Sequence, residues 1–394
     1  MGEELPRRWL NRNVLAIGFA DLMADFNYEM VLAVLPLFIT AGLGAPAAVV
    51  GLVEGVADGS SALIKLWSGW FSDRIPWRRH LGTVGYGCTV VGFGTMNMAL
   101  SWPQVLAGRS FAWIGRGLRQ PIRSAMLAGS VERRDLGKAF GFHQAMDTLG
   151  ALLGPGVAFW LLYSGQGFRP VFLAAIVPGL LAVLSFGLLP RDPRKTLAEN
   201  QPRWQPLPRS FWRFITAVAV FGAGNFAIAF FTLRALEMLR PSLGQQAAIA
   251  GAVLFFLAHN AVGAAVSFPA GWLADRIGKP WVLATGYAAF AVACVVAIFA
   301  TGPAGVGLLA IPAGVHAPLV DATEGSLASE LVADDRRGTA FGVLHGVNGA
   351  GDLLSSVVVG ALWSSLGAAA GLTFGAVLGL AGAGLLLILT RPKG

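Results

Sequence analysis

Residues 69–79 read GWFSDRIPWRR, and residues 271–279 repeat that pattern as GWLADRIGK. A second pair of matching stretches, GKAFG at 137–141 and GTAFG at 338–342, has almost the same separation. The two separations are 202 and 201 residues, and two matches at nearly one spacing are not expected by chance. The sequence therefore predicts a chain made of two similar halves.

The composition of the chain requires a membrane. Hydrophobic residues make up 55% of the 394 residues and charged residues only 13%, with a mean hydropathy of +0.64. A soluble domain carries about 25% charged residues, so a water-soluble globule is excluded. The 52 glycines follow no period of three, heptads are absent and only two cysteines are present, which excludes collagen, a coiled coil and a disulfide-stapled secreted fold. An all-α polytopic membrane protein remains.

Apolar stretches of 18 or more residues predict twelve transmembrane helices. Six lie in the predicted bundle 1–190 and six in the predicted bundle 211–394, and the polar, proline-rich stretch 191–210 is predicted to link them in the cytoplasm. The predicted spans are 13–40, 46–70, 80–100, 103–129, 138–163, 168–190, 211–238, 245–272, 280–301, 303–330, 338–366 and 368–390.

Lys and Arg residues predict the orientation of these spans. Of the 29 basic residues, 21 fall at the termini, in the linker or in loops on one side, whereas only Arg169 and Arg240 fall in loops on the other. By the positive-inside rule both termini are predicted to be cytoplasmic, in an inner membrane of bacterial type. The net charge of +8 then reflects topology, and no nucleic-acid partner is expected.

The repeated halves resemble the major facilitator superfamily. The family's loop signature, roughly G-x-L-x-D-R-x-G-R-R/K, is similar to both quoted loops, although Pro76 replaces the second glycine in the first copy. Three further stretches, GLVEGV at 51–56, GRGLRQPIR at 115–123 and AFGFHQAMD at 139–147, resemble a poorly characterised bacterial branch of the family. The resemblance implies two six-helix bundles that rock around one central site, as in a secondary transporter that works by alternating access.

The repeated loops are predicted to form a cytoplasmic latch. A carboxylate at a helix end can accept hydrogen bonds from the free N–H groups of a neighbouring helix N-terminus and can pair with arginine. Such a contact can break and form again between inward-open and outward-open states, whereas plain interfacial anchoring is the alternative. The residues assigned to the latch are Gly69, Asp73, Arg74, Arg78, Gly271, Asp275 and Arg276.

Acidic residues within the spans are predicted to handle protons or cations. A charge inside a span costs about 2.5–3.5 kcal/mol or more, so it requires a function or a partner. Asp21, Asp25 and Glu29 share one face of the first span by their i, i+4, i+8 spacing, and Glu54 and Asp58 form a similar pair on the second. A carboxylate in a poorly hydrated cavity can carry a proton near neutral pH. Structural pairs with the basic residues of the spans are the alternative.

Basic side chains are concentrated in the fourth predicted span, where they are Arg109, Arg116, Arg119 and Arg123. The family resemblance implies a proton-relay arginine in this span, which matches Arg109 or Arg116 only loosely, and we group Arg116 with the coupling carboxylates. The repeat brings Asp321 and Glu324 to nearby positions on the tenth span. We expect these acids and the remaining arginines to form a charge relay or a gate of ion pairs between the bundles. A site for an anionic substrate and static structural pairs are the alternatives.

The fifth span contains a candidate packing motif. Gly150, Gly154 and Pro155 resemble the G-x-x-x-G-P core of the family's antiporter motif, which implies export rather than import. Small residues at this spacing also allow close helix packing with no transport role.

Other polar residues are predicted to line the central cavity. His143 and Asp147 have an i, i+4 spacing on the fifth span, Asn260 occupies the repeat position of Asp58, and Asp352 lies in the eleventh span. No His-x-x-His, Cys-x-x-Cys or Glu-x-x-His spacing occurs, so neither a metal site nor a cofactor is predicted. Walker loops, dinucleotide fingerprints and nucleophile elbows are absent as well, so no enzyme is predicted.

These patterns predict proton-coupled efflux, that is antiport, of a small molecule by a monomer embedded in the lipid bilayer. Proton- or cation-coupled uptake and export of a divalent metal cation are the alternatives within transport. A membrane receptor or scaffold on the same fold is the alternative outside transport. The cost of charges within the spans argues against that last alternative, because a scaffold has no use for them.

Overall fold

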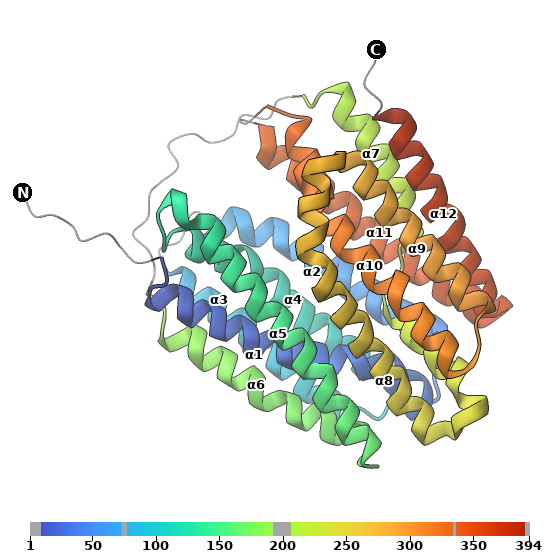
Figure 1. Ribbon diagram of the computed structural model, residues 1–394. Helices are drawn as coiled ribbons and strands as arrows, with labels where there is room; N and C mark the ends of the chain where they lie inside the picture. The colour runs from blue at the N-terminus through green and yellow to red at the C-terminus, as the bar shows by residue number, and fades with distance from the viewer. Residues whose placement is uncertain (1–8, 73–76, 192–205, 334–335, 391–394) are drawn as a thin grey trace, which may run out of the picture. The chain divides into compact units, whose positions relative to one another are not determined.

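The computed structural model describes residues 9–72, 77–191, 206–333 and 336–390. Helices account for most of these residues, and no strand occurs among them (Figure 1). The predicted all-α class is therefore confirmed.

The N-terminal helices follow the predicted spans to within a few residues. They are α1 (Arg12–Leu37), which continues as the π-helical turn η1 (Phe38–Gly42), then α2 (Ala47–Ser72), α3 (Arg78–Asn97), α4 (Trp102–Ala128), the 3₁₀ turn η2 (Arg133–Asp135), α5 (Leu136–Tyr163) and α6 (Phe168–Leu188).

The seventh predicted span is interrupted. The C-terminal helices are α7 (Arg209–Gly222), α8 (Ala229–Ile277), α9 (Lys279–Phe299), α10 (Gly302–Glu330), α11 (Arg337–Leu366) and α12 (Ala368–Leu389). The prediction of one continuous helix over 211–238 is wrong, because residues 223–228 leave the helix between α7 and α8. Two serines of α11 replace the lost helical hydrogen bonds. Ser355 donates to the carbonyl oxygen of Asn225 at 2.9 Å, and Ser356 accepts from the N–H of Ala227 at 3.2 Å.

The long helix α8 contains a sharp bend at Gly244. A straight helix of 49 residues would be far longer than the roughly 30 Å hydrocarbon core of a bilayer. Gly244 has φ 74° and ψ 173°, a conformation that residues with a Cβ rarely adopt. The bend divides α8 into the end of the predicted seventh span and the whole of the eighth.

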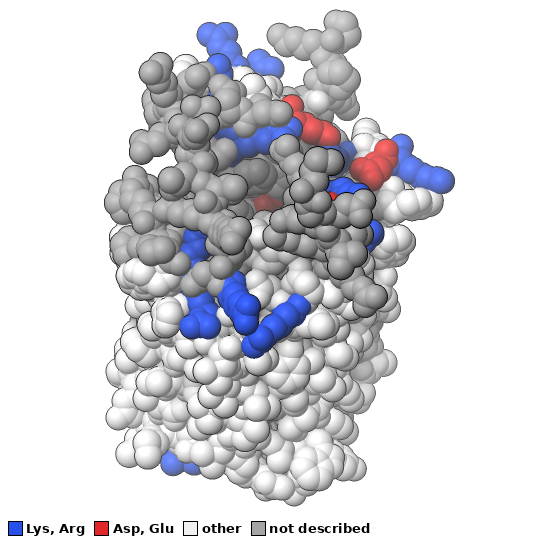
Figure 2. Space-filling model, turned by 90° about the vertical axis from the view of Figure 1, so that its left-hand side faces the viewer, with Lys and Arg blue, Asp and Glu red and all other residues white. Residues whose placement is uncertain are grey.

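Nine helices of the described chain are long and apolar enough to cross a membrane. Two other helices do not meet these criteria of length and apolar composition, because α7 has only 14 residues and α4 carries four arginines. On the face shown in Figure 2, blue and red side chains gather toward one end, whereas most of the remaining surface is uncharged. Such an uncharged surface suits contact with lipid.

The described residues divide into two compact units. The first, which we call the N-unit, draws them from Met1–Val34 and Ser60–Glu199, and the second, the C-unit, from Leu35–Gly59 and Asn200–Gly394. In the N-unit α3 packs on α4 and α6, and in the C-unit α9 packs on α10 and α12. The sequence repeat relates α3, α4 and α6 to α9, α10 and α12, so corresponding helices pack together in both units. Residues 192–205 of the predicted linker lie outside the described residues, and the boundaries of the two membrane bundles stay a prediction.

Close contact between α2 and α11 explains why part of α2 packs within the C-unit. A Cβ on Gly51 would lie 2.1 Å from the carbonyl oxygen of Ser356, and one on Gly360 would lie 3.0 Å from that of Ala47. The two helices therefore approach backbone to backbone, which small residues permit.

Candidate functional site

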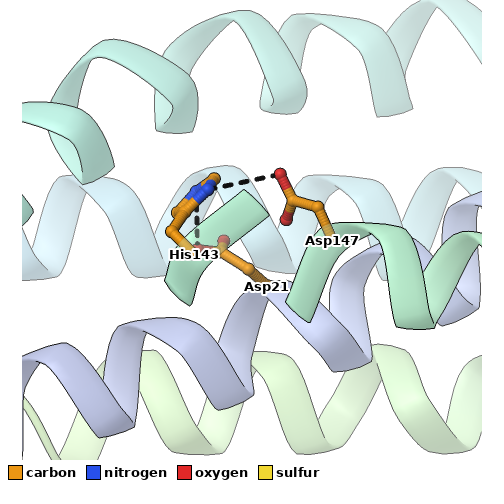
Figure 3. A group of neighbouring side chains, drawn as sticks. All are labelled: Asp21, His143 and Asp147. Atoms are coloured by element: carbon orange, nitrogen blue, oxygen red, sulfur yellow. Dashed lines mark ion pairs between the residues drawn. The ribbon is translucent and has the colours of Figure 1, made fainter. Parts of the chain in front are cut away.

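Four helices of the N-unit contribute polar side chains around Asp21 of α1. Asp21 is fully buried and accepts a hydrogen bond from the Tyr86 hydroxyl of α3 at 2.8 Å. Arg123 of α4 donates from Nη1 to the same Oδ1 atom at 2.8 Å. The other carboxylate oxygen, Oδ2, lies 2.9 Å from Nε2 of His143 on α5 (Figure 3). Three partners from three helices thus surround one buried carboxylate.

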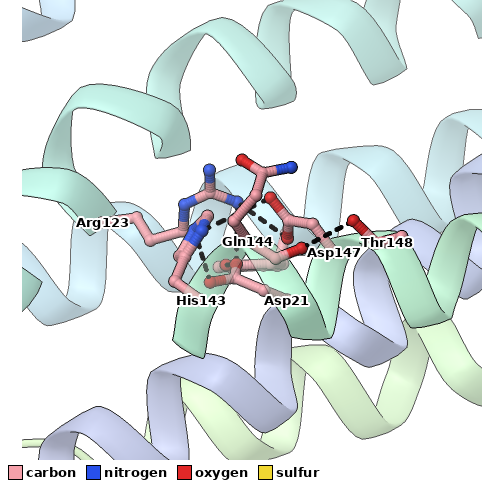
Figure 4. Close-up of polar contacts among 7 residues, drawn as sticks. Asp21, Arg123, His143, Gln144, Asp147 and Thr148 are labelled. Carbon is pink, nitrogen blue, oxygen red and sulfur yellow. Dashed lines mark hydrogen bonds and ion pairs between the residues drawn. The ribbon is translucent and has the colours of Figure 1, made fainter. Parts of the chain in front are cut away.

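Asp147 completes this group, which we call the Asp21 cluster: Asp21, Tyr86, Arg123, His143 and Asp147. Nδ1 of His143 lies 3.4 Å from Oδ2 of Asp147, one helical turn further along α5. Nη1 of Arg123 lies 4.0 Å from Oδ1 of Asp147, so the guanidinium faces both aspartates (Figure 4). The imidazole therefore lies between two carboxylates, with one ring nitrogen toward each.

The Asp21 cluster contains two acids, one arginine and one histidine. When the imidazole is neutral, the formal charges of the cluster's residues add up to −1. One added proton makes this total zero. A neutral imidazole carries one N–H, so it can donate to only one of the two carboxylates, whereas the protonated ring donates to both. The arrangement can therefore hold one exchangeable proton.

The three atoms Asp21 Oδ, His143 N and Asp147 Oδ also lie within 4.8 Å of one another, a spacing that could hold a metal ion. The Arg123 guanidinium, however, already lies against Oδ1 of Asp21. A positive group in that place opposes a second cation, so the donor set fits a proton better than a metal ion.

The other arginines of α4 stack on aromatic rings. The guanidinium carbon of Arg109 lies 3.2 Å from the ring centre of Trp113, and that of Arg119 lies 4.4 Å from the ring centre of Tyr86. Arg116 donates to the Tyr28 hydroxyl at 3.1 Å. Stacking on aromatic faces stabilises a guanidinium in a poorly hydrated interior. Arg123 pairs with the aspartates of the Asp21 cluster, and Arg119 contacts the cluster through the ring of Tyr86.

Asp25 lies one turn beyond Asp21 on α1, where α5 packs closely. A Cβ on Gly150 would lie 2.5 Å from the carbonyl oxygen of Leu22 and 3.0 Å from Cβ of Asp25. A Cβ on Gly154 would lie 2.7 Å from the backbone nitrogen of Met30, next to Glu29. The glycines of the predicted antiporter-like motif, which Pro155 follows, therefore hold α5 against the acidic face of α1.

The C-unit contains a second polar cluster, around Glu324 of α10. Tyr287 of α9 donates to Oε1 of Glu324 at 3.1 Å, and Asn348 of α11 donates to Oε2 at 2.7 Å. Glu324 is 8% exposed, whereas Asp321, one turn earlier, is exposed. We call Tyr287, Glu324 and Asn348 the Glu324 cluster.

The remaining predicted residues lie apart from these clusters. Glu54 and Asp58 of α2 and Asp352 of α11 belong to the C-unit, so within one unit they do not join the acids of α1. Oδ1 of Asn260 lies 3.0 Å from Nδ1 of His259 on α8. Within a unit the structure thus brings Asp21 and Asp147 together, but it does not add Glu54, Asp58 or Asp352 to them.

The predicted latch is described only in part. Asp73 and Arg74 lie outside the described residues, while Gly69 lies near the end of α2 and Arg78 begins α3. In the second copy, Gly271, Asp275 and Arg276 lie in the last turns of α8, and the Arg276 guanidinium lies 4.0 Å from the ring centre of Trp272. With the described residues as partners, neither Asp275 nor Arg276 forms an ion pair, and the latch stays a prediction.

The C-unit also encloses a pocket that the sequence did not predict. Its volume is about 360 Å³, and its polar lining includes Glu237, Arg240 and Gln245. The carboxylate of Glu237 accepts hydrogen bonds from the indole N–H of Trp363 and from Arg234, both at 3.1 Å. Arg234, which the sequence places within a span, therefore has a structural partner.

Sequence reasoning missed Tyr86, Tyr287 and Asn348. A tyrosine in an apolar helix looks like a core residue, and a lone asparagine gives no motif. The repeat is the signal that could have found them, because Tyr86 and Tyr287 are 201 residues apart, as are Asp147 and Asn348. Arg123 and Glu324 have the same separation.

Comparison with known proteins gives a family match over almost the whole chain. A sequence model described as the Major Facilitator Superfamily matches residues 17–258 and 235–394. An uncharacterized MFS-type transporter of Methanocaldococcus jannaschii is 29% identical over 359 residues, which cover 90% of this chain and 89% of that protein. A probable 4-methylmuconolactone transporter of Cupriavidus pinatubonensis is 26% identical over 88% of this chain and 82% of its own length. The quinolone resistance protein NorA of Staphylococcus aureus is 22% identical over 58% of each chain.

Solved structures show the same fold. A variant of the nucleoside transporter NupG aligns with a TM-score of 0.80, at 13% identity, over 96% of this chain and 100% of that one. A bacterial homologue of the human lysosomal transporter Spinster aligns with a TM-score of 0.76, at 15% identity, over 96% of each chain. The predicted arrangement of twelve helices fits these neighbours.

Proposed function

The chain belongs to the major facilitator superfamily of transporters, and on this premise we propose that it exports a small molecule in exchange for protons. The position of His143 between Asp21 and Asp147 carries this proposal. The Asp21 cluster lacks one positive charge when the imidazole is neutral, and a proton supplies it. Transport coupling needs a group that can take up and release a proton, and an imidazole with one ring nitrogen toward each of two carboxylates is such a group.

Proton binding at His143 changes how α5 is held to α1. The protonated imidazole donates to Asp21 on α1 and to Asp147 on α5 at once. After the imidazole loses a proton, one of its two nitrogens has a lone pair in place of the N–H. The contact between that nitrogen and its carboxylate is then weaker. Because Gly150 packs α5 against α1 beside Asp25, this change reaches the acidic face of α1.

Two further observations favour export over import. The Gly150, Gly154 and Pro155 stretch resembles the family's antiporter motif, and it packs α5 against α1. One relative is named a quinolone resistance protein.

The test uses the full chain in proteoliposomes that enclose a pH-sensitive dye. Candidate substrates are added one at a time, and substrate flux and proton movement are recorded together. We expect His143→Gln to keep substrate exchange and to reduce the accompanying proton movement. The matched control is His345→Gln, which alters an exposed histidine of α11 at nearly the same repeat position. Proton movement in His143→Gln equal to that of the unaltered chain would show that coupling does not pass through this cluster.

Proton-coupled uptake is the second candidate function. The relative named a probable 4-methylmuconolactone transporter matches 88% of this chain, against 58% for NorA, and its name does not specify a direction. Proteoliposomes with opposite pH gradients separate the two candidates. Under export, substrate leaves the cytoplasmic side as protons enter it, and under uptake both move together.

The other proposals concern the setting of the transporter. We place it in the inner membrane as a monomer with both termini cytoplasmic, without cofactor or enzymatic activity. Export of a divalent metal is less well supported, because Arg123 already pairs with the carboxylate that would bind the ion. A receptor or scaffold would gain nothing from an ionic cluster whose burial is costly.

A further inference from the structure

The sequence repeat gives the Asp21 cluster a counterpart in the C-unit. Tyr86, Arg123 and Asp147 correspond, at a spacing of 201, to Tyr287, Glu324 and Asn348. In both units the tyrosine hydroxyl donates to a buried carboxylate, Asp21 in one and Glu324 in the other. The tyrosine donor is thus the same in both units, whereas Arg123 of α4 is replaced by the acid Glu324 of α10, which itself accepts the hydrogen bond.

The two clusters differ in how their charge is balanced. Asp21 faces Arg123 and His143, whereas both oxygens of Glu324 face neutral donors. Gly222 occupies the repeat position of Asp21, and an aromatic ring precedes it: Phe221 stacks on Tyr287 at 3.6 Å between ring centres. Within the described residues Glu324 has no ion pair with Lys, Arg or His, although it is only 8% exposed.

Titratable groups on the helices that pack against α10 do not supply the missing charge. On α8, His259 is engaged with Asn260. On α9, Lys279 pairs with Glu330 at the far end of α10. His316 of α10 itself bonds to the carbonyl oxygen of Gly286. None of the other described titratable groups on these helices forms an ion pair with Glu324: Arg234, Glu237, Arg240, Asp275 and Arg276 on α8, Tyr287 and Cys294 on α9, Asp321 on α10, and Arg337, His345 and Asp352 on α11. Asp321 and Asp352 can only add negative charge.

A buried carboxylate without a counter-ion is costly, and a bound proton removes the cost. We propose that Glu324 is a second proton-binding site of the protein, distinct from His143. Asn348 suits both states of this site. Its NH₂ group donates to the carboxylate, and after rotation of the amide its oxygen accepts from the protonated acid.

This site extends the proposed proton coupling from one unit to both, but its proton binding does not depend on transport. It is therefore measured on the purified full chain without substrate. Infrared difference spectra are recorded during a pH titration, and the carbonyl stretch of a protonated carboxyl group is followed. We expect Glu324→Gln to lose one such band. His143→Gln should keep that band, so failure of the Glu324 site and failure of the proposed coupling are distinguishable.

The control is Glu237→Gln, which removes a carboxylate that already has Arg234 and Trp363 as partners. We expect its protonated-carboxyl band to match that of the unaltered chain. If Glu324→Gln does not fold, Asn348→Leu provides the test. Loss of a donor to the ionised form should keep the band to a higher pH. Spectra of Glu324→Gln that superimpose on those of the unaltered chain, or an unchanged titration in Asn348→Leu, would overturn the proposal.

Discussion

At the scale of the residue, Asp21 is the side chain on which the N-unit depends most. It is fully buried, and its two oxygens serve Tyr86, Arg123 and His143. Asp21→Asn would leave the Arg123 guanidinium buried without its main counter-ion, which costs about 3 kcal/mol or more in comparable buried pairs. We expect a marked loss of thermal stability of the purified protein in detergent.

The matched control at the same scale is Asp147→Asn. The Asp147 side chain is 16% exposed and lies 4.0 Å from Arg123, against 0% and 2.8 Å for Asp21, so its loss should cost less than that of Asp21. Equal losses of stability in the two variants would contradict the central role of Asp21. Both residues could be predicted as functional from the sequence, since a charge in an apolar span stands out. Their roles could not be ranked, because burial and partners depend on three other helices.

At the scale of the element, the contact between α2 and α11 requires a specific glycine. A Cβ on Gly51 would lie 2.1 Å from the carbonyl oxygen of Ser356, whereas one on Gly59, two turns along the same helix, would make ordinary contacts at 3.5 Å. Gly51→Ala should therefore separate the helices and destabilise the protein by about 1–3 kcal/mol. Gly59→Ala makes the same chemical change and should have little effect. Thermal unfolding of both variants checks this, and similar melting curves would show that the close approach does not matter.

The elements also show what the sequence can predict. Ten of the twelve predicted spans correspond to single helices, counting η1 with α1, because long apolar runs bounded by charge are strong local signals. The break at 223–228 is not predicted because AGNFAI has a single polar residue, Asn225, within a long apolar run. Its backbone groups depend on serines about 130 residues away in α11. Long-range contacts of that kind leave no local pattern. The bend at Gly244 was obscured for a related reason, since one glycine among 52 gives no warning.

At the scale of the whole molecule, the repeat is a better guide to the sites than any single motif. The sequence predicted Arg123 and Glu324 as partners in a gate between the bundles. Each has its own partners within its unit: Asp21 and Asp147 for Arg123, and Tyr287 and Asn348 for Glu324. The repeat pointed to both residues, but charge alone could not identify their partners. Hydrogen-bonding residues such as Tyr287 and Asn348 emerge only once the helices are packed.

The two proposed proton sites, His143 and Glu324, would together set the proton-to-substrate ratio of the cycle. If His143 and Glu324 each release one proton per turnover, the unaltered chain should exchange two protons for each substrate molecule. Either His143→Gln or Glu324→Gln should lower the ratio to one, because each removes one site and leaves the other in its own unit. The double variant, His143→Gln with Glu324→Gln, should let substrate reach equal concentrations on both sides, and a pH gradient should not change this. The measurement sets a substrate gradient against a series of pH gradients in proteoliposomes and finds the balance at which net flux stops. Suppose that the unaltered chain exchanges one proton for each substrate molecule and that Glu324→Gln does not change this ratio. Coupling would then be limited to the N-unit, even if Glu324 binds a proton.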